Sequence, residues 1–196
     1  MKLTVKNQET YSRLELILRT LFGWIYIAIP HGFVLFFVGL WSSILTFISF
    51  WVVLFTARYP QSFFEFQVGY YRWALRLRAR LNNIADGYPA FGIKGTDENT
   101  SFDVPYPEKL SRGILILRVL FGLFYVMIPH GFILFFRMIA TGFVIFIAWW
   151  IVLFTAKYPK GLHDFVTGTI RWGTRVNIYM GFMTDTYPPF TGKEIE

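Results

Sequence analysis

The sequence predicts an all-α integral membrane protein built from two tandem repeats, each a transmembrane helical hairpin followed by an amphipathic interfacial helix. The chain aligns with itself at a constant offset of 99 residues, and 37 of the 80 pairs between 12–91 and 111–190 are identical. Hydrophobic residues make up 55% of the chain and charged residues only 16%, against about 25% charged in soluble domains. Repetition and an excess of apolar residues therefore define the class together.

Two long apolar segments are the predicted membrane crossings. Phe33 to Phe55 carries no charge over 23 residues, and Phe132 to Phe154 is interrupted only by Arg137. At about 1.5 Å per helical residue, such a segment covers roughly 35 Å, enough to cross a hydrocarbon core of about 30 Å. The polar first ten residues predict no cleavable signal peptide. The chain has no cysteine, which excludes a thiol nucleophile or thiolate metal site.

A shorter apolar run precedes each long one, at Leu14–Ile29 and Ile114–Ile128. About 16 helical residues extend some 24 Å, so the run either crosses or re-enters as a half-helix. A crossing would require Pro30-His31-Gly32 to turn the chain back, which gives hairpins at about 14–56 and 113–155. This topology places nearly all lysines and arginines on one side, as the positive-inside rule expects of a cytoplasmic face. We therefore prefer the hairpin, and the sequence leaves full crossing undecided.

A Tyr-Pro sequence ends each long segment, and a helical pattern with aromatic and arginine faces follows it. These patterns predict surface helices at about 61–82 and 160–181, lying in the headgroup plane with their aromatic side toward the lipid. The predicted organisation is a first repeat at 1–91, a polar cytoplasmic linker at 92–110 and a second repeat at 111–196.

The order of blocks from Arg118 to Phe190 is R…IPH…LFF…LFT[AG][RK]YPxxxxxFxxGxxRWxxRxxxY…TDxYPPF. It resembles a family of bacterial integral membrane proteins known as domain of unknown function 4389, and the resemblance extends to both repeats. The first repeat departs from it in the tail, which reads ADGYPAF from Ala85 to Phe91. The resemblance implies a multi-pass protein of the bacterial inner membrane with tandem hairpins. It supplies no activity, substrate or catalytic residue. We expect both termini in the cytoplasm.

A repeated R-W-x-x-R motif gives the first candidate site. Its members are Arg72, Trp73 and Arg76 in the first repeat, and Arg171, Trp172 and Arg175 in the second. Two guanidinium groups four residues apart share one helix face and can hold a phosphate, so anionic lipid headgroups are natural ligands. Alternatively, Asp86 and Asp185, or Glu65 and Asp164, form structural ion pairs with these arginines. Both roles are open.

His31 and His130 occupy equivalent predicted turns. Two imidazoles brought together by a twofold axis could ligate haem or a metal. Neither has a second histidine, cysteine or carboxylate within four residues, so we prefer a structural role, in which the ring hydrogen-bonds carbonyls freed at a helix end. Arg137 occupies the position that Val38 has in the first repeat. A charge in a crossing helix suggests contact with a partner or an anionic ligand. We predict no metal site and no cofactor.

The sequence contains no Gly-rich phosphate loop, HExxH or GxSxG motif, so we predict that the protein is not an enzyme. The net charge of +7 falls on membrane-proximal segments, which favours anionic lipid over nucleic acid as the partner. The first hypothesis is a non-catalytic membrane subunit or scaffold that packs against other subunits or against copies of itself. The alternative is a small transporter, channel or lipid-handling protein that uses the seam between the repeats.

Overall fold

The computed structural model describes residues 1–195. The elements of the first half are β1 (Lys2–Val5), α1 (Arg13–Gly23), the π-helix η1 (Trp24–Ala28), α2 (Ile29–Thr56) and α3 (Gln61–Leu81). Those of the second half are β2 (Thr100–Asp103), α4 (Arg112–Gly122), the π-helix η2 (Leu123–Met127), α5 (Ile128–Thr155) and α6 (Lys160–Met180). Each helix of the second half begins 99 residues after its equivalent in the first. We call residues 99 apart equivalent.

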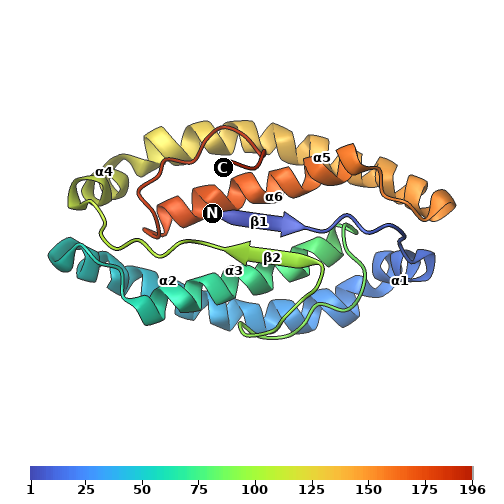
Figure 1. The fold of residues 1–196 in the computed structure, drawn as a ribbon, viewed down its shortest axis with the longest axis horizontal. Coiled ribbons are helices and arrows are strands. Elements are labelled where there is room, and N and C mark those ends of the chain that lie inside the picture. Colours follow the sequence, from blue (N-terminus) through green and yellow to red (C-terminus); the bar gives the residue numbers. More distant parts are fainter. Residues whose placement is uncertain (196) are drawn as a thin grey trace.

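The elements α1, η1 and α2 form one helical stretch from Arg13 to Thr56. This corrects the predicted hairpin, because Pro30-His31-Gly32 lies inside the helix and does not reverse the chain. Pro30 falls in the first turn of α2, and the wider π-helical turn before it accommodates the missing N–H. The helix bends instead: Figure 1 views α1 nearly end-on while α2 runs across the page. The second half repeats this bend at η2, between α4 and α5.

A two-stranded antiparallel ribbon adds β-structure to the predicted all-α fold. β1 and β2 pair with Leu3 opposite Phe102, two residues that are themselves equivalent. The strands are short and one lies in the predicted linker, so their alternation of polar and apolar residues was too brief to indicate a sheet. Because equivalent residues face each other, an approximate twofold axis passes through the ribbon at this pair, perpendicular to it (Figure 1).

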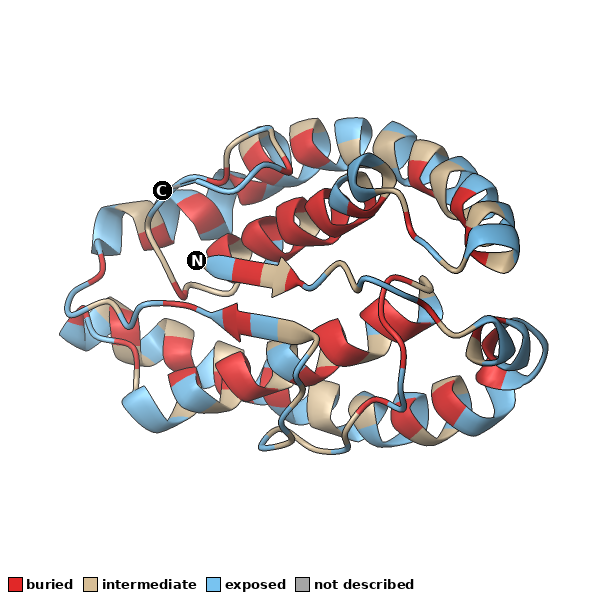
Figure 2. Cartoon of the chain, turned by 45° about the vertical axis from the view of Figure 1, so that its right-hand side comes forward, coloured by how far each residue is buried: buried red, intermediate tan, exposed pale blue. Residues whose placement is uncertain are grey.

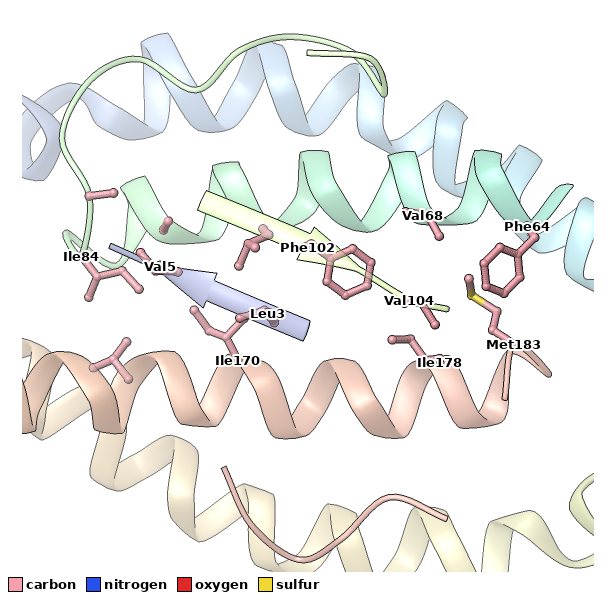
Figure 3. Close-up of a cluster of buried hydrophobic side chains, with 14 of the residues drawn as sticks. Leu3, Val5, Phe64, Val68, Ile84, Phe102, Val104, Ile170, Ile178 and Met183 are labelled. Atoms are coloured by element: carbon pink, nitrogen blue, oxygen red, sulfur yellow. The ribbon is translucent and has the colours of Figure 1, made fainter. Parts of the chain in front are cut away.

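The helices α3 and α6 lie between the ribbon and the long helices α2 and α5 (Figure 1). Side chains from α3, α6 and the inner ribbon face, including Leu3, Phe102 and Ile170, form the main hydrophobic core (Figure 3). The bounds of the predicted surface helices are close to those of α3 and α6, but the tryptophans of these helices do not face outward as predicted. Trp73 and Trp172 are buried, because each indole contacts a histidine of the long helix, His31 or His130.

The start of each bent helix is joined to the end of the other. The Leu110 N–H donates to the Ala57 carbonyl, and the Tyr11 N–H donates to the Ala156 carbonyl, both at 2.8 Å. Tyr11 is equivalent to Leu110, and a twofold rotation keeps equivalent residues at the same height along its axis. Each bent helix therefore begins and ends at one height along the axis.

The long helices leave most of their apolar surface uncovered. In each stretch, Arg13–Thr56 and Arg112–Thr155, only 17% of the most apolar 18-residue window is buried. Figure 2 shows exposed residues in pale blue along the outer helices, whereas red residues are concentrated on the inner helix α6. Both stretches are long and apolar enough to span a membrane.

Candidate functional site

We call the segments that follow α3 and α6, at 82–99 and 181–195, the tails. An aspartate of the first tail binds the first residues of α1. The Asp86 carboxylate accepts the Ser12 N–H at 2.6 Å and the Arg19 guanidinium at 2.7 Å. The equivalent residues Ser111, Arg118 and Asp185 make the same contacts, at 2.6 and 3.1 Å. Both aspartates thus form ion pairs with these arginines of α1 and α4. The alternative in which they pair with the arginines of the R-W-x-x-R motif is not what the structure shows.

The tyrosine of each tail bonds to the bend in the long helix. The Tyr88 hydroxyl donates to the Tyr26 carbonyl at 3.2 Å, and the Tyr187 hydroxyl donates to the Tyr125 carbonyl at 2.8 Å. Each of these carbonyls lies four residues before the proline of the bend, where an α-helix would use the N–H that proline lacks. The tail therefore satisfies a carbonyl that the bend would otherwise leave free.

The two candidate histidines lie in this cluster and are fully buried. The indole N–H of Trp73 donates to Nδ1 of His31 at 2.8 Å, and that of Trp172 donates to Nδ1 of His130 at 2.9 Å. A phenylalanine of the tail stacks on each ring, with centroids 3.8 Å apart for Phe91 on His31 and 3.9 Å apart for Phe190 on His130. The histidine contacts a tryptophan of the R-W-x-x-R motif, a link between two motifs that their spacing in sequence does not indicate.

The second histidine has partners at both ring nitrogens. An Nδ1 that accepts from an indole leaves the proton of a neutral ring on Nε2. In His130, Nε2 lies 3.1 Å from the Tyr187 hydroxyl, to which it can donate, while in His31 Nε2 has no partner among the described residues. Residues 1–195 contain no group of three or more histidine, cysteine, aspartate or glutamate side chains placed to hold a metal.

The R-W-x-x-R arginines mostly bond to backbone carbonyls. Arg76 donates to the carbonyls of Ala90, Gly92 and Gly95, and Arg175 to those of Thr191 and Lys193. The first arginine of each motif reaches the ribbon strand of the other half: Arg72 donates to Phe102, and Arg171 donates to Leu3. These arginines hold the tails and the ribbon in place. Arg72 is the exposed member of the set.

Gly69 and Gly168 allow the tails to cross α3 and α6 closely. A Cβ at Gly69 would lie 2.9 Å from the Ile93 side chain, and one at Gly168 would lie 3.1 Å from the Gly192 carbonyl oxygen. The structure places the tail backbone there.

A polar pocket lies beside the ribbon in the first half. It has a volume of about 350 Å³ and is lined by residues of α3, the tail and β2, including Arg76, Lys94 and Asp97. Arg80 makes a bidentate ion pair with Asp97, at 2.5 and 2.8 Å. Burial alone would raise the pKa of Asp97, but the hydrogen bonds from Arg80 and Thr100 outweigh it and hold that pKa below its usual value.

The pocket of the second half is about 660 Å³ in volume and includes Arg137. The Arg137 Nε donates to Thr169 at 2.9 Å, and its guanidinium lies 4.2 Å from the centre of the Phe165 ring. The side chain is therefore turned toward α6. Besides Arg137, the lining residues that carry charge are Lys160, Asp164, Arg171, Lys193 and Glu194. The sequence analysis identified Arg137, Asp164 and Arg171, but missed the two lysines and Thr167 because they match no motif.

These features define a largely helical protein with two bent apolar helices, a central ribbon and a polar pocket on each side of it. Residues 115–192 match the sequence model of the family described as domain of unknown function (DUF4389), so this part of the second half is similar to that family. The match does not extend to the first half. No curated protein matches the chain. No solved structure matches it either.

Proposed function

We propose that the chain is a non-catalytic integral membrane scaffold of the bacterial inner membrane, built from two tandem copies of one domain. The observation that carries the proposal is the apolar surface of the two bent helices. Aromatic and aliphatic side chains along α2 remain exposed from one end to the other: Phe33, Phe37, Leu40, Ile44, Phe47, Trp51 and Phe55. A soluble protein rarely leaves a contiguous apolar patch of more than a few hundred Å² open to water. Lipid or other membrane proteins are the natural partners of this surface.

The twofold axis suggests how the protein sits. The outer face of the ribbon exposes Lys2, Ser101 and Asp103, and it lies midway along the long helices. If α2 crossed the bilayer along its full length, these polar residues would enter the hydrocarbon, at a cost of about 2.5–3.5 kcal/mol for each charge near its centre. With the axis along the membrane normal, the ribbon stays in water. Each bent helix then enters the membrane and returns to the same side.

Ligands of the scaffold follow from its charge. Lys94 and Lys193 lie in the exposed tails beside the ribbon, on the face that this orientation directs toward the headgroups. Lysines near an anionic leaflet contribute about 1 kcal/mol each to binding. We propose anionic lipid on this face, and other membrane subunits or further copies of the chain against the apolar sides of α2 and α5.

Copurification tests the scaffold. The full chain is extracted from its native membrane in mild detergent, and its assembly mass is measured after size separation. We expect a particle well above the 23.0 kDa of one chain, with a constant set of companion subunits or copies. A monodisperse single chain, without protein companions at any extraction condition, would contradict the proposal.

One observation favours the alternative of a lipid-handling protein. A groove of about 650 Å³ between α5 and α6 has a mostly apolar lining and includes Gly131, Gly142 and Gly173, beside which no other atom approaches closely. A groove of this size can hold an acyl chain. Lipid transfer between liposomes that requires the protein, and that is lost when Gly173→Leu fills the groove, would support this alternative. The scaffold proposal expects no transfer.

A further inference from the structure

Some of the residues that differ between the halves line the second-half pocket. The clusters at the helix starts and bends use residues identical in both halves. In contrast, three lining residues of this pocket replace less polar ones: Arg137 for Val38, Lys160 for Gln61 and Thr167 for Val68. The second-half pocket is also the larger, at about 660 Å³ against 350 Å³. The shared residues maintain the fold, and the differing ones give this pocket properties of its own.

The pocket carries uncompensated positive charge. Two internal ion pairs neutralise part of its lining, Arg171 with Glu194 at 2.7 Å and Lys160 with Asp164 at 2.6 Å. Arg137 and Lys193 have no carboxylate partner among residues 1–195. The charged side chains named in the lining therefore sum to a net charge of +2. This charge suits a phosphate group that carries between one and two negative charges.

Two hydrogen-bonding groups of the pocket are unused. The Thr167 side chain is 3% exposed, and its buried hydroxyl has no partner in the described part of the chain. Arg137 uses Nε and Nη2, on Thr169 and the Phe165 carbonyl, so Nη1 has no protein acceptor there. A buried hydroxyl without a partner costs about 1–3 kcal/mol, which an acceptor bound in the pocket would recover.

We infer that the second-half pocket is a phosphate-binding site, with Arg137 and Lys193 supplying charge and Thr167 donating a hydrogen bond. The recognised chemistry is a tetrahedral phosphate, whether it belongs to a lipid headgroup or to a soluble anion. The inference goes beyond the proposed scaffold, because the pocket would bind phosphate in detergent whichever way the helices sit in a membrane.

The test measures binding to the full chain in uncharged detergent, with two probes in separate titrations: inorganic phosphate and short-chain phosphatidic acid, with phosphatidylcholine as the lipid control. Two variants take the residue that the first half already carries, Arg137→Val and Thr167→Val. A third, Arg58→Gln, removes an exposed arginine that lines neither this pocket nor the groove between α5 and α6.

Saturable binding of at least one phosphate probe is expected. Arg137→Val should weaken binding at least tenfold, and Thr167→Val about three- to tenfold. The melting temperature of Thr167→Val should not fall, since its hydroxyl has no partner among the described residues. Arg58→Gln should change the affinity less than twofold. Binding of phosphatidic acid alone assigns the pocket to a headgroup, and binding of inorganic phosphate assigns it to a free phosphate.

Three results would overturn the inference. The first is no saturable binding of either phosphate probe to the wild-type chain. The second is wild-type affinity in both pocket variants, and the third is an equal loss in Arg58→Gln, which would indicate unspecific attraction to a basic protein.

Discussion

Gly168 and Gly192 mark a place where two backbones touch. A Cβ on Gly192 would lie 2.5 Å from the Gly168 carbonyl oxygen, which is closer than carbon and oxygen atoms pack. Gly173 lies on the same helix, and a Cβ there meets no neighbouring atom within 4 Å. The two helical glycines therefore differ only in what lies next to them, so a pair of alanine substitutions separates contact from helix propensity.

Gly168→Ala should lower the unfolding free energy by about 1–3 kcal/mol, because the added methyl pushes the tail away from α6. Gly173→Ala should leave it unchanged or raise it by up to about 1 kcal/mol, through better helix propensity. Chemical unfolding of both variants in detergent measures the difference. Equal stability of the two would show that the tail does not press on α6.

His163 makes the stability depend on pH. Its side chain is 1% exposed, its Nε2–H donates to the Ile84 carbonyl at 3.1 Å, and burial lowers the pKa of the ring. The unfolded chain binds this proton near pH 6.5, the folded chain only at lower pH. The contribution of the His163 ring to the free energy of unfolding is therefore fully present above about pH 6.5. It decreases as the pH falls below that value, by at most about 1.4 kcal/mol per pH unit.

Phe64, the equivalent residue of the first half, provides the matched replacement. The unfolding free energy of wild type and His163→Phe is compared between pH 7.5 and pH 5 in the same detergent. The wild type should lose more stability on acidification than the variant. A variant with the same pH dependence would show that other groups are responsible.

At the level of elements, the bend of each long helix depends on residues distant in sequence. The tail after α3 makes three such contacts: the Tyr88 hydroxyl donates to the bend, Phe91 stacks on the histidine, and the Asp86 carboxylate accepts a hydrogen bond at the start of α1. The corresponding blocks of the sequence are conserved between the halves because they meet at this place. Their shared role is to connect α1, α2 and α3.

The tail carboxylates should contribute strongly to stability, because the arginine that each pairs with is buried. Arg118 is 1% exposed and pairs with Asp185. Asp185→Asn removes its charge partner and should cost about 3 kcal/mol of unfolding free energy. Asp103→Asn is the control: it breaks an ion pair with the exposed Arg72 and should cost less than about 1 kcal/mol. Similar costs in the two variants would contradict the account of the buried pair.

Several elements could be predicted from sequence and others could not. The apolar runs and the Tyr-Pro sequences that end them predict the bounds of α2, α3, α5 and α6 to within a few residues, because helix periodicity and proline act locally. The turn at Pro30 was predicted wrongly, because a proline in the first turn of a helix and one in a reverse turn look alike in sequence. The partners of the R-W-x-x-R arginines are backbone carbonyls, which carry no sequence signal. The ribbon strands were too short to recognise.

The whole molecule brings its polar elements to one side. The ribbon, both tails and the second-half pocket surround the twofold axis, while apolar side chains cover the outside of the long helices. Both ends of each bent helix share one height along this axis, as the bonds from Leu110 and Tyr11 require. This arrangement is the basis of the proposal that both halves enter the membrane from the same face.

The chain has no native cysteine, so single cysteines can report the side of the membrane directly. Arg58→Cys and Lys157→Cys mark the two exposed ends of the long helices, and Gly32→Cys marks a bend that no other atom approaches closely. Membrane-impermeant maleimide is applied to right-side-out and inverted vesicles. We expect cysteines at 58 and 157 to react from one and the same side, and a cysteine at 32 not to react from that side. Reaction of 58 and 157 from opposite sides would contradict it.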